Sequence, residues 1–196
     1  MHERNLKINF GANIPMKRVM RVCVFGLVGF LTFSFGAEFE LKNLKSLEAD
    51  FVQVVSTQEE MTLSYSGKLQ AKAPNKAKWS YEPPMQKEVF VNDKELIVYE
   101  PALQQAHIQS LVAQQDFFEI LSKAEKVEGK KRLRAEIDGI IYNIFLDSKG
   151  LPKRIEYSDN LENTTIITLE NVKINPKIAD SVFVFVVPKG IDILRH

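Results

Sequence analysis

Residues able to do chemistry are few in this sequence, and they do not combine into a catalytic set. The only cysteine and the histidines are Cys23, His2, His107 and His196. No GxSxG, phosphate-binding loop or HExxH pattern occurs. The acidic pairs Glu48–Asp50 and Glu59–Glu60 are interpreted as solvated surface, and His107 falls on the polar side of an alternating segment. We therefore expect a protein that is not an enzyme; a lipid-acting enzyme that uses His107 stays an alternative.

The size and composition are those of one globular domain. The chain has 196 residues, of which 45% are hydrophobic and 26% charged, and its formal net charge is +1. No groove of basic and aromatic residues stands out, so nucleic acid binding is not expected. A lone cysteine excludes an intramolecular disulfide and a cysteine-based zinc site, and no cofactor is expected.

The first 36 residues have the pattern of an export signal. Its positively charged start consists of Lys17, Arg18 and Arg21. Val22–Phe35 is an uncharged run of about 14 residues, short of the ~20 that a membrane-spanning helix needs. Small residues predict cleavage near Gly36/Ala37, and Met16 before the basic cluster indicates that residues 1–15 are an over-extended start. We expect a single domain over 37–196, exported to the periplasm; an N-terminal membrane anchor is the alternative.

Residues 61–111 show the two-residue period of antiparallel strands. The apolar parity of the first strand carries Met61, Leu63, Tyr65, Gly67, Leu69 and Ala71. Ala77, Trp79 and Tyr81 repeat the pattern until Pro83–Pro84 ends it. Further alternation predicts strands at 89–91, 96–99 and 104–111. The pattern leaves open whether the apolar side covers a packed core or a cavity.

The remaining chain predicts helices and more strands. Apolar residues at spacings of three and four predict a helix over 41–55, and residues 111–124 predict a second helix capped by Asp116. Alternation predicts strands over 132–138, 140–146, 155–157, 165–169 and 181–187. About ten antiparallel strands are too many for one flat open sheet. We therefore expect a mainly β (α+β) fold, an incomplete, curled antiparallel β-barrel with helices lidding the concave apolar face.

Several short motifs follow one another along this chain. They are Phe51-Val52-Gln53, Gly67-Lys68-Leu69, Pro74 five residues before Trp79, Trp79–Pro84, Val91–Lys94, Val98-Tyr99, Gln105, Phe183–Phe185 and Pro188–Gly190. None is specific alone, but their order and spacing resemble those of the periplasmic outer-membrane lipoprotein carriers, the LolA-like family, over residues 37–194. Two positions depart from the family pattern. Ala73 and Ala77 stand where many members have a lid-latching arginine and a phenylalanine at the cavity mouth, so apolar contact alone is expected to hold the lid.

The resemblance implies a function, partners and a site. Family members accept a triacylated lipoprotein from an inner-membrane ABC exporter, shield its acyl chains across the periplasm and release it at the outer membrane. The implied partners are therefore acylated lipoproteins, that exporter and, where one exists, a dedicated outer-membrane acceptor, and we expect a monomer. The residues implied to bind lipid in the cavity and the lid are Leu63, Tyr65, Leu69, Trp79, Tyr81, Val91, Val98, Phe117, Phe118 and Leu121.

Three non-catalytic alternatives stay open. A membrane-anchored acceptor of the same fold would need a lipid-modified cysteine at its mature N-terminus, and Cys23 does not look like one. A lipocalin-like periplasmic binder of another hydrophobic ligand would share the export signal and the barrel, but its barrel would usually be fully closed. A structural or adaptor protein of the cell envelope would pack the apolar face solid. Native mass spectrometry of bound material tests the lipocalin-like alternative, and the binding of a hydrophobic dye tests the structural or adaptor alternative.

Overall fold

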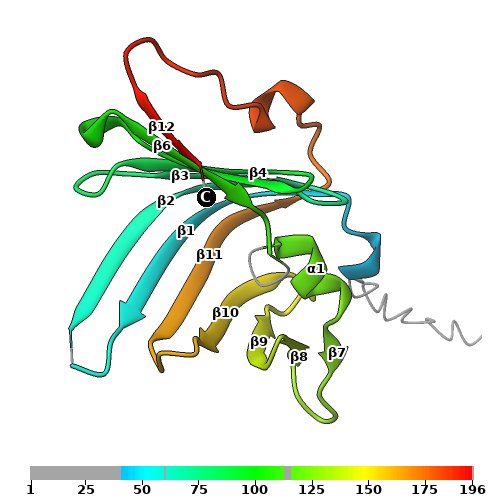
Figure 1. The fold of residues 1–196 in the computed structure, drawn as a ribbon. Helices are drawn as coiled ribbons and strands as arrows, with labels where there is room; N and C mark the ends of the chain where they lie inside the picture. Colours follow the sequence, from blue (N-terminus) through cyan, green and yellow to red (C-terminus); the bar gives the residue numbers. More distant parts are fainter. Residues whose placement is uncertain (1–40, 60, 113–115, 196) are drawn as a thin grey trace, which may run out of the picture. The chain divides into compact units, whose positions relative to one another are not determined.

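The computed structural model describes residues 41–195, apart from residues 60 and 113–115 (Figure 1). The export signal predicted for residues 1–36 lies outside these described residues. Within them, most of the chain forms one curled sheet of 12 strands. The strands are β1 (Ser46–Ser56), β2 (Thr62–Lys72), β3 (Lys76–Tyr81), β4 (Lys87–Asn92), β5 (Glu95–Glu100), β6 (Gln105–Ser110), β7 (Glu125–Lys126), β8 (Arg132–Ile137), β9 (Ile140–Leu146), β10 (Pro152–Ser158), β11 (Thr164–Ile174) and β12 (Asp192–Arg195).

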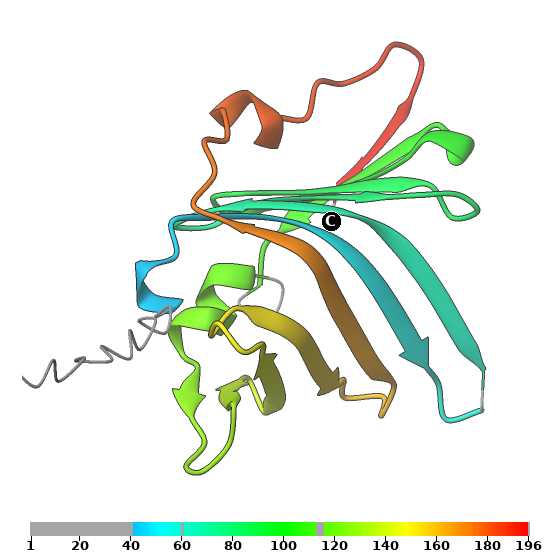
Figure 2. The same ribbon diagram turned by 180° about the vertical axis from the view of Figure 1, so that it is seen from behind.

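The sheet is open, with β12 and β7 at its two edges. Its strand order is β12-β6-β5-β4-β3-β2-β1-β11-β10-β9-β8-β7, and neighbours are antiparallel except for the parallel pair of β12 and β6. The two views in Figures 1 and 2 show the sheet curling, so that β8–β10 and β3–β6 face each other across α1. The expected incomplete, curled antiparallel barrel is therefore confirmed.

Strand register carries one apolar surface across almost the whole sheet. Directly paired residues of antiparallel strands point to the same face. Phe51 pairs with Gly67 on β2 and with Leu169 on β11, and Gly67 pairs in turn with Tyr81 on β3. The same face continues through Ile155 on β10 to β9 and β8. This concave face provides most of the main cluster of buried apolar side chains.

The helix predicted over 41–55 is wrong. Leu41–Asn43 forms one 3-10 turn, η1, and the chain then enters β1, the strand that pairs with both β2 and β11. The same segment fits two periods. Leu41, Leu44 and Leu47 fit the spacing of a helix, whereas Leu47, Phe51 and Gln53 fit the two-residue period of a strand and lie on the concave face. β-branched Val52, Val54 and Val55 favour the strand, and pairing along both of its edges decides the outcome.

The second predicted helix is present but shorter than expected. α1 covers Phe117–Ser122 and buries Phe117, Ile120 and Leu121 against the concave face. It is the only α-helix among the described residues; the other helical segments are the 3-10 turns η1, η2 (Pro101–Leu103) and η4 (Asp180–Phe183). None of the helices in this described part is long and apolar enough to cross a membrane. A six-residue helix is not stable alone, so packing on the sheet holds it.

The strand predicted over 181–187 is also wrong. Residues 180–183 form η4, and the chain runs on without regular structure until β12. In both ribbon views this C-terminal segment lies on the opposite side of β3–β6 from α1. Phe183 is fully buried, and Phe185 contacts the rings of Phe90 and Tyr99 at centroid distances of 5.4 Å. The alternation in the sequence therefore marks a segment packed across the convex face, outside the hydrogen-bonded ladder.

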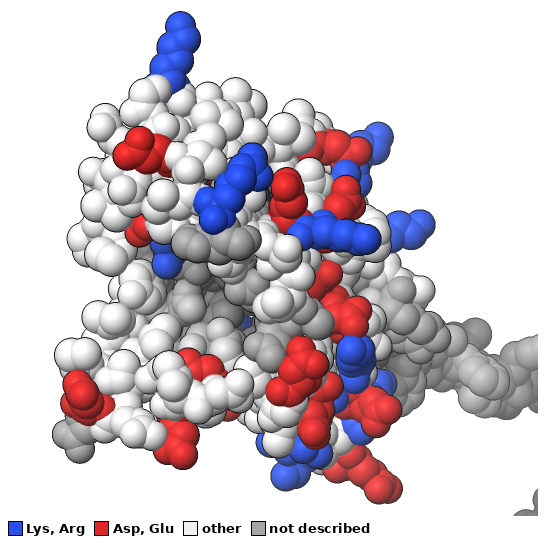
Figure 3. Space-filling view, in the orientation of Figure 1, with Lys and Arg blue, Asp and Glu red and all other residues white. Residues whose placement is uncertain are grey.

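Charged side chains of both signs are spread over the surface. In Figure 3, basic and acidic residues intermix on the side of α1 and β7, while the opposite side of this view is mostly uncharged. On the convex face, Asp180 of η4 forms ion pairs with Lys72 at 2.8 Å and Lys76 at 3.4 Å. These two lysines keep the pKa of the Asp180 carboxyl below its usual value. The ion pairs place the start of the C-terminal segment over the β2–β3 turn.

Candidate functional site

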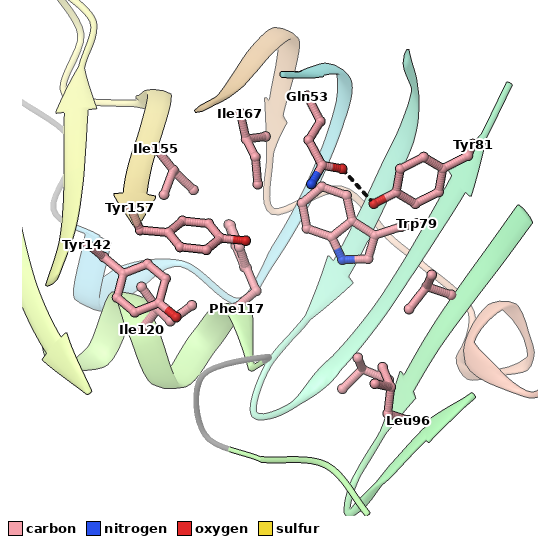
Figure 4. A pocket seen from close by; sticks show the side chains of 12 residues that line it. Gln53, Trp79, Tyr81, Leu96, Phe117, Ile120, Tyr142, Ile155, Tyr157 and Ile167 are labelled. Carbon is pink, nitrogen blue, oxygen red and sulfur yellow. Dashed lines mark hydrogen bonds between the residues drawn. The ribbon is translucent and has the colours of Figure 1, made fainter. Parts of the chain in front are cut away.

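A cavity of about 210 Å³ lies between the concave face and α1 (Figure 4). Its walls come from β1, β3, β4, β5, β9, β10 and β11 on the sheet side and from α1 on the other. The lining residues are Gln53, Trp79, Tyr81, Val89, Val91, Leu96, Phe117, Ile120, Tyr142, Ile155, Tyr157 and Ile167. Eight of these are aliphatic or are Phe or Trp, so the surface suits an apolar ligand. Ligand pockets usually enclose about 300–1,000 Å³, so the cavity in this structure is small.

The position of α1 follows from its N-terminal cap. The Asp116 carboxylate accepts hydrogen bonds from the backbone N–H groups of Phe118 at 2.9 Å and Glu119 at 3.2 Å. Burial raises the pKa of the Asp116 carboxyl, and these two bonds oppose the rise. The cap fixes the first turn of the helix and directs Phe117 and Ile120 into the cavity wall.

Three aromatic rings meet in the inner wall because β2 has a glycine between them. The Phe51 ring lies 5.0 Å from the rings of both Trp79 and Tyr81, edge to face in each case. Phe51 and Tyr81 belong to β1 and β3, which are separated by β2. They touch because Gly67, directly between them in register, has no side chain to keep them apart.

Four polar side chains interrupt the apolar lining, and we name them the tyrosine–glutamine cluster: Gln53, Tyr81, Tyr142 and Tyr157. The Tyr81 hydroxyl donates a hydrogen bond of 2.9 Å to Oε1 of Gln53, and the rings of Tyr142 and Tyr157 lie 4.9 Å apart. Burial is the main cause of raised pKa values for the phenols of Tyr81 and Tyr157, and it raises the pKa of Tyr142 to about 12. All three phenols therefore stay protonated at neutral pH.

The residues predicted to bind lipid fall into two groups. Trp79, Tyr81, Val91 and Phe117 line the cavity. The other six do not line it. Leu69 and Leu121 are buried in the core, Tyr65 contacts the Tyr81 ring at 6.0 Å, Val98 pairs with Val89, Phe118 contacts Phe117, and Leu63 is 48% exposed at the outer end of β2.

Eight lining residues were missing from the prediction. They are Gln53, Val89, Leu96, Ile120, Tyr142, Ile155, Tyr157 and Ile167. Gln53 fell inside the wrongly predicted helix. Tyr142, Ile155 and Tyr157 fall within the predicted strands 140–146 and 155–157, but sequence alternation does not tell which distant strand lies beside which. The pairing of β1 with β11 is what brings β9 and β10 to the cavity.

The polar interpretation of His107 also needs correction. His107 pairs with Val98, which pairs with Val89, so it lies on the concave face. Ala106 and Ile108 lie on the opposite face, with Tyr99 and Ile97. Both faces of β5 and β6 are therefore partly covered. Within the described residues, no group of three or more His, Cys, Asp or Glu side chains is placed to hold a metal ion.

Comparison with known proteins assigns the family. The model of the outer membrane lipoprotein carrier protein LolA matches residues 42–141. A protein of Helicobacter hepaticus named outer-membrane lipoprotein carrier protein is 38% identical over 174 residues, covering 89% of this chain and 94% of its own length. The chain belongs to the LolA family. A LolA-family protein of the same name from Helicobacter pylori strain J99 is 42% identical over 191 residues, covering 92% of this chain and 100% of its own length.

A solved structure agrees with this LolA fold. An uncharacterized conserved protein from Thermus thermophilus superposes with a TM-score of 0.51 at 13% sequence identity, covering 79% of this chain and 92% of its own. At the position where many LolA-family members have phenylalanine, Ala77 is 2% exposed and pairs with Ala71 and Val91.

Proposed function

We propose that this protein is an exported carrier that binds the acyl chains of lipoproteins. The observation that carries the proposal is the mainly apolar cavity between the concave face and α1. Its described lining contains no carboxylate, histidine or cysteine, so it is suited to bind and not to make or break bonds. The named function of the LolA-family relatives, outer-membrane lipoprotein carrier, supports the same activity.

The proposed route runs through the periplasm between two membranes. An inner-membrane ABC exporter supplies the acylated lipoprotein, and the outer membrane, with or without a dedicated acceptor, receives it. The export pattern of residues 1–36, with cleavage near Gly36/Ala37, supports the periplasmic location, and 37–196 is the carrier domain, acting as a monomer. Transfer passes from one cavity directly to the next, because free acyl chains would aggregate in water.

The size of the cavity explains how a carrier can release its cargo. Burial of each methylene group contributes about 0.8 kcal/mol, so one long chain fully buried approaches ~10 kcal/mol. That affinity is too high for release unless another free energy opposes it. Lifting α1 from the sheet exposes Phe117, Ile120 and Leu121, and this cost offsets part of the gain from burying the cargo.

Fluorescence of Trp79 tests the proposal, because it is the only tryptophan and it lines the cavity. Titration of the mature protein with a diacylated lipopeptide is expected to shift and saturate the emission. The same peptide without acyl chains is the matched control and should leave the spectrum unchanged. Equal responses to both peptides, or no response to either, would contradict acyl-chain binding. Native mass spectrometry that finds only a different hydrophobic ligand in protein from periplasm would favour the lipocalin-like alternative.

A further inference from the structure

The tyrosine–glutamine cluster is not what a purely hydrocarbon ligand requires. A hydroxyl or amide group buried without a hydrogen-bonding partner costs roughly 1–3 kcal/mol, so apolar cavities usually exclude such groups. Here three phenols and one amide line a cavity whose other walls are aliphatic side chains, the Phe117 ring and the indole of Trp79. Replacement of the phenols by Phe would leave the packing of the rings intact. The oxygens and the amide therefore call for an explanation of their own.

Three members of the cluster, Gln53, Tyr81 and Tyr157, lie at a boundary along their strands. On β1, Leu47 and Phe51 are at most 1% exposed, and the next concave residue, Gln53, is half-buried. On β10, Ile155 is buried and Tyr157, two residues further along, is half-buried. On β3, buried Ala77 is followed by half-buried Trp79 and Tyr81. On these three strands the deeper residues are apolar, and hydrogen-bonding side chains begin where exposure to solvent begins. On β9, by contrast, Tyr142 is itself buried, between Ile140 and Ile144.

The hydrogen-bond donors of the cluster converge on the cavity. In Figure 4 the amide nitrogen of Gln53 lies on the side away from Tyr81, and the Tyr157 hydroxyl points toward the same space from the opposite wall. Gln53 uses its oxygen to accept from Tyr81, so the two N–H groups are not part of that bond. Burial raises the pKa of the Tyr157 phenol, and a hydrogen bond with the Thr165 side chain opposes the rise, so Tyr157 keeps its O–H throughout the neutral range.

A group that matches this arrangement is an oxygen acceptor fixed to the end of a hydrocarbon chain. Every acyl chain has one, since it begins with a carbonyl group where it joins the rest of the molecule. Tyrosine is enriched at membrane interfaces for the same reason, with its ring in apolar and its hydroxyl in polar surroundings. We propose that the tyrosine–glutamine cluster binds the carbonyl oxygen at the head of a bound acyl chain. This inference rests on the proposed function and specifies which chemical class of chain the site prefers.

A comparison of ester and ether probes tests this proposal. The first probe is a lipopeptide with two ester-linked acyl chains; the second has ether-linked alkyl chains of the same length, and so the same tails without the two carbonyl oxygens. Wild-type protein is expected to bind the ester probe about three- to tenfold more tightly, the range of one or two net hydrogen bonds. Binding of both probes with equal affinity would overturn this inference and leave the carrier function standing. Binding of neither probe would overturn the carrier function and this inference with it.

Substitutions then assign the preference to the cluster. Two variants are used. The first is Tyr157→Phe, and the second combines Gln53→Leu with Tyr81→Phe, so that no hydroxyl loses its partner. Each should reduce the preference for the ester probe and leave the affinity for the ether probe within about twofold of wild type. The matched control is Tyr99→Phe, which removes a phenol on the convex face. Unfolding curves check that each variant is folded, and the wild-type comparison decides the question even if a variant is not. Retention of the full preference in both cluster variants would overturn the assignment.

Discussion

Gly67 shows how one residue without a side chain determines the shape of the cavity wall. It lies between Phe51 and Tyr81 in a rung that crosses three strands. A Cβ atom built on it would lie 2.0 Å from the backbone oxygen of Ser80 and 3.0 Å from the Phe51 ring. The close approach of β2 to β3 and the meeting of the two rings therefore both depend on the absence of a side chain.

We predict that Gly67→Ala destabilises the protein. The clash is with backbone of the neighbouring strand, which cannot turn away as a side chain can, so the loss should reach the upper end of the ~1–3 kcal/mol typical of overpacking. Urea unfolding followed by the fluorescence of Trp79 measures it. Ser66→Ala, one residue away with its side chain on the other face, is the control and should change stability by less than about 0.5 kcal/mol. Equal effects of the two substitutions would show that the glycine is not needed for packing.

At the scale of elements, the sequence predicted strands well where one face is exposed to solvent and the other is buried. The alternation from Leu63 to Ala71 is a clear case: the strand forms as predicted, and from Gly67 to Ala71 the burial alternates as well, whereas Leu63 at the outer end is exposed. Prediction failed for β1, because Leu41, Leu44, Leu47 and Phe51 satisfy a helical period as well. Only the pairing of β1 with β2 and β11, which local sequence does not contain, settles the choice.

The strand predicted in the C-terminal segment was wrong for a different reason. Phe183 and Phe185 alternate with exposed Val184 and Val186, as in a strand, but they pack on the convex face without joining the ladder. Five buried apolar residues lie outside the main cluster: Phe90, Ala106, Ile108, Ile178 and Phe183. A two-residue period reports which side chains are buried; it does not report whether the backbone bonds to a neighbour. A second small hydrophobic cluster was therefore not predictable from the pattern.

We predict that Phe183→Ala detaches the C-terminal segment from the convex face. The side chain is fully buried, so truncation should cost about 3–5 kcal/mol if the segment stays in place, and less if it releases. Hydrogen exchange should show faster exchange over residues 178–195 while β1 and β2 stay protected. Val186→Ala, at a site that is 79% exposed, is the control and should be close to neutral. Unchanged exchange in the Phe183 variant would mean that β12 and the Asp180 ion pairs hold the segment without the ring.

For the whole molecule, the sheet is covered on both faces but in different ways. α1 closes over a cavity on the concave face, whereas the C-terminal segment packs solidly on the convex face. The sequence and the family resemblance led to the cavity and to four of its lining residues. Its volume depends on how far the sheet curls and where α1 rests. Both follow from many long-range contacts, and no local pattern encodes them.

This asymmetry predicts that two similar substitutions differ in their effect on binding. Phe117→Ala removes a buried ring from the contact between α1 and the sheet, so opening costs less and a diacylated lipopeptide should bind more tightly, by about tenfold for each ~1.4 kcal/mol of eased opening. Its release to acceptor vesicles should slow accordingly. Phe183→Ala, a matched loss of a buried ring on the convex face, should destabilise the fold without tightening binding. Weaker binding by the Phe117 variant would show instead that this ring holds cargo more than it holds α1 closed.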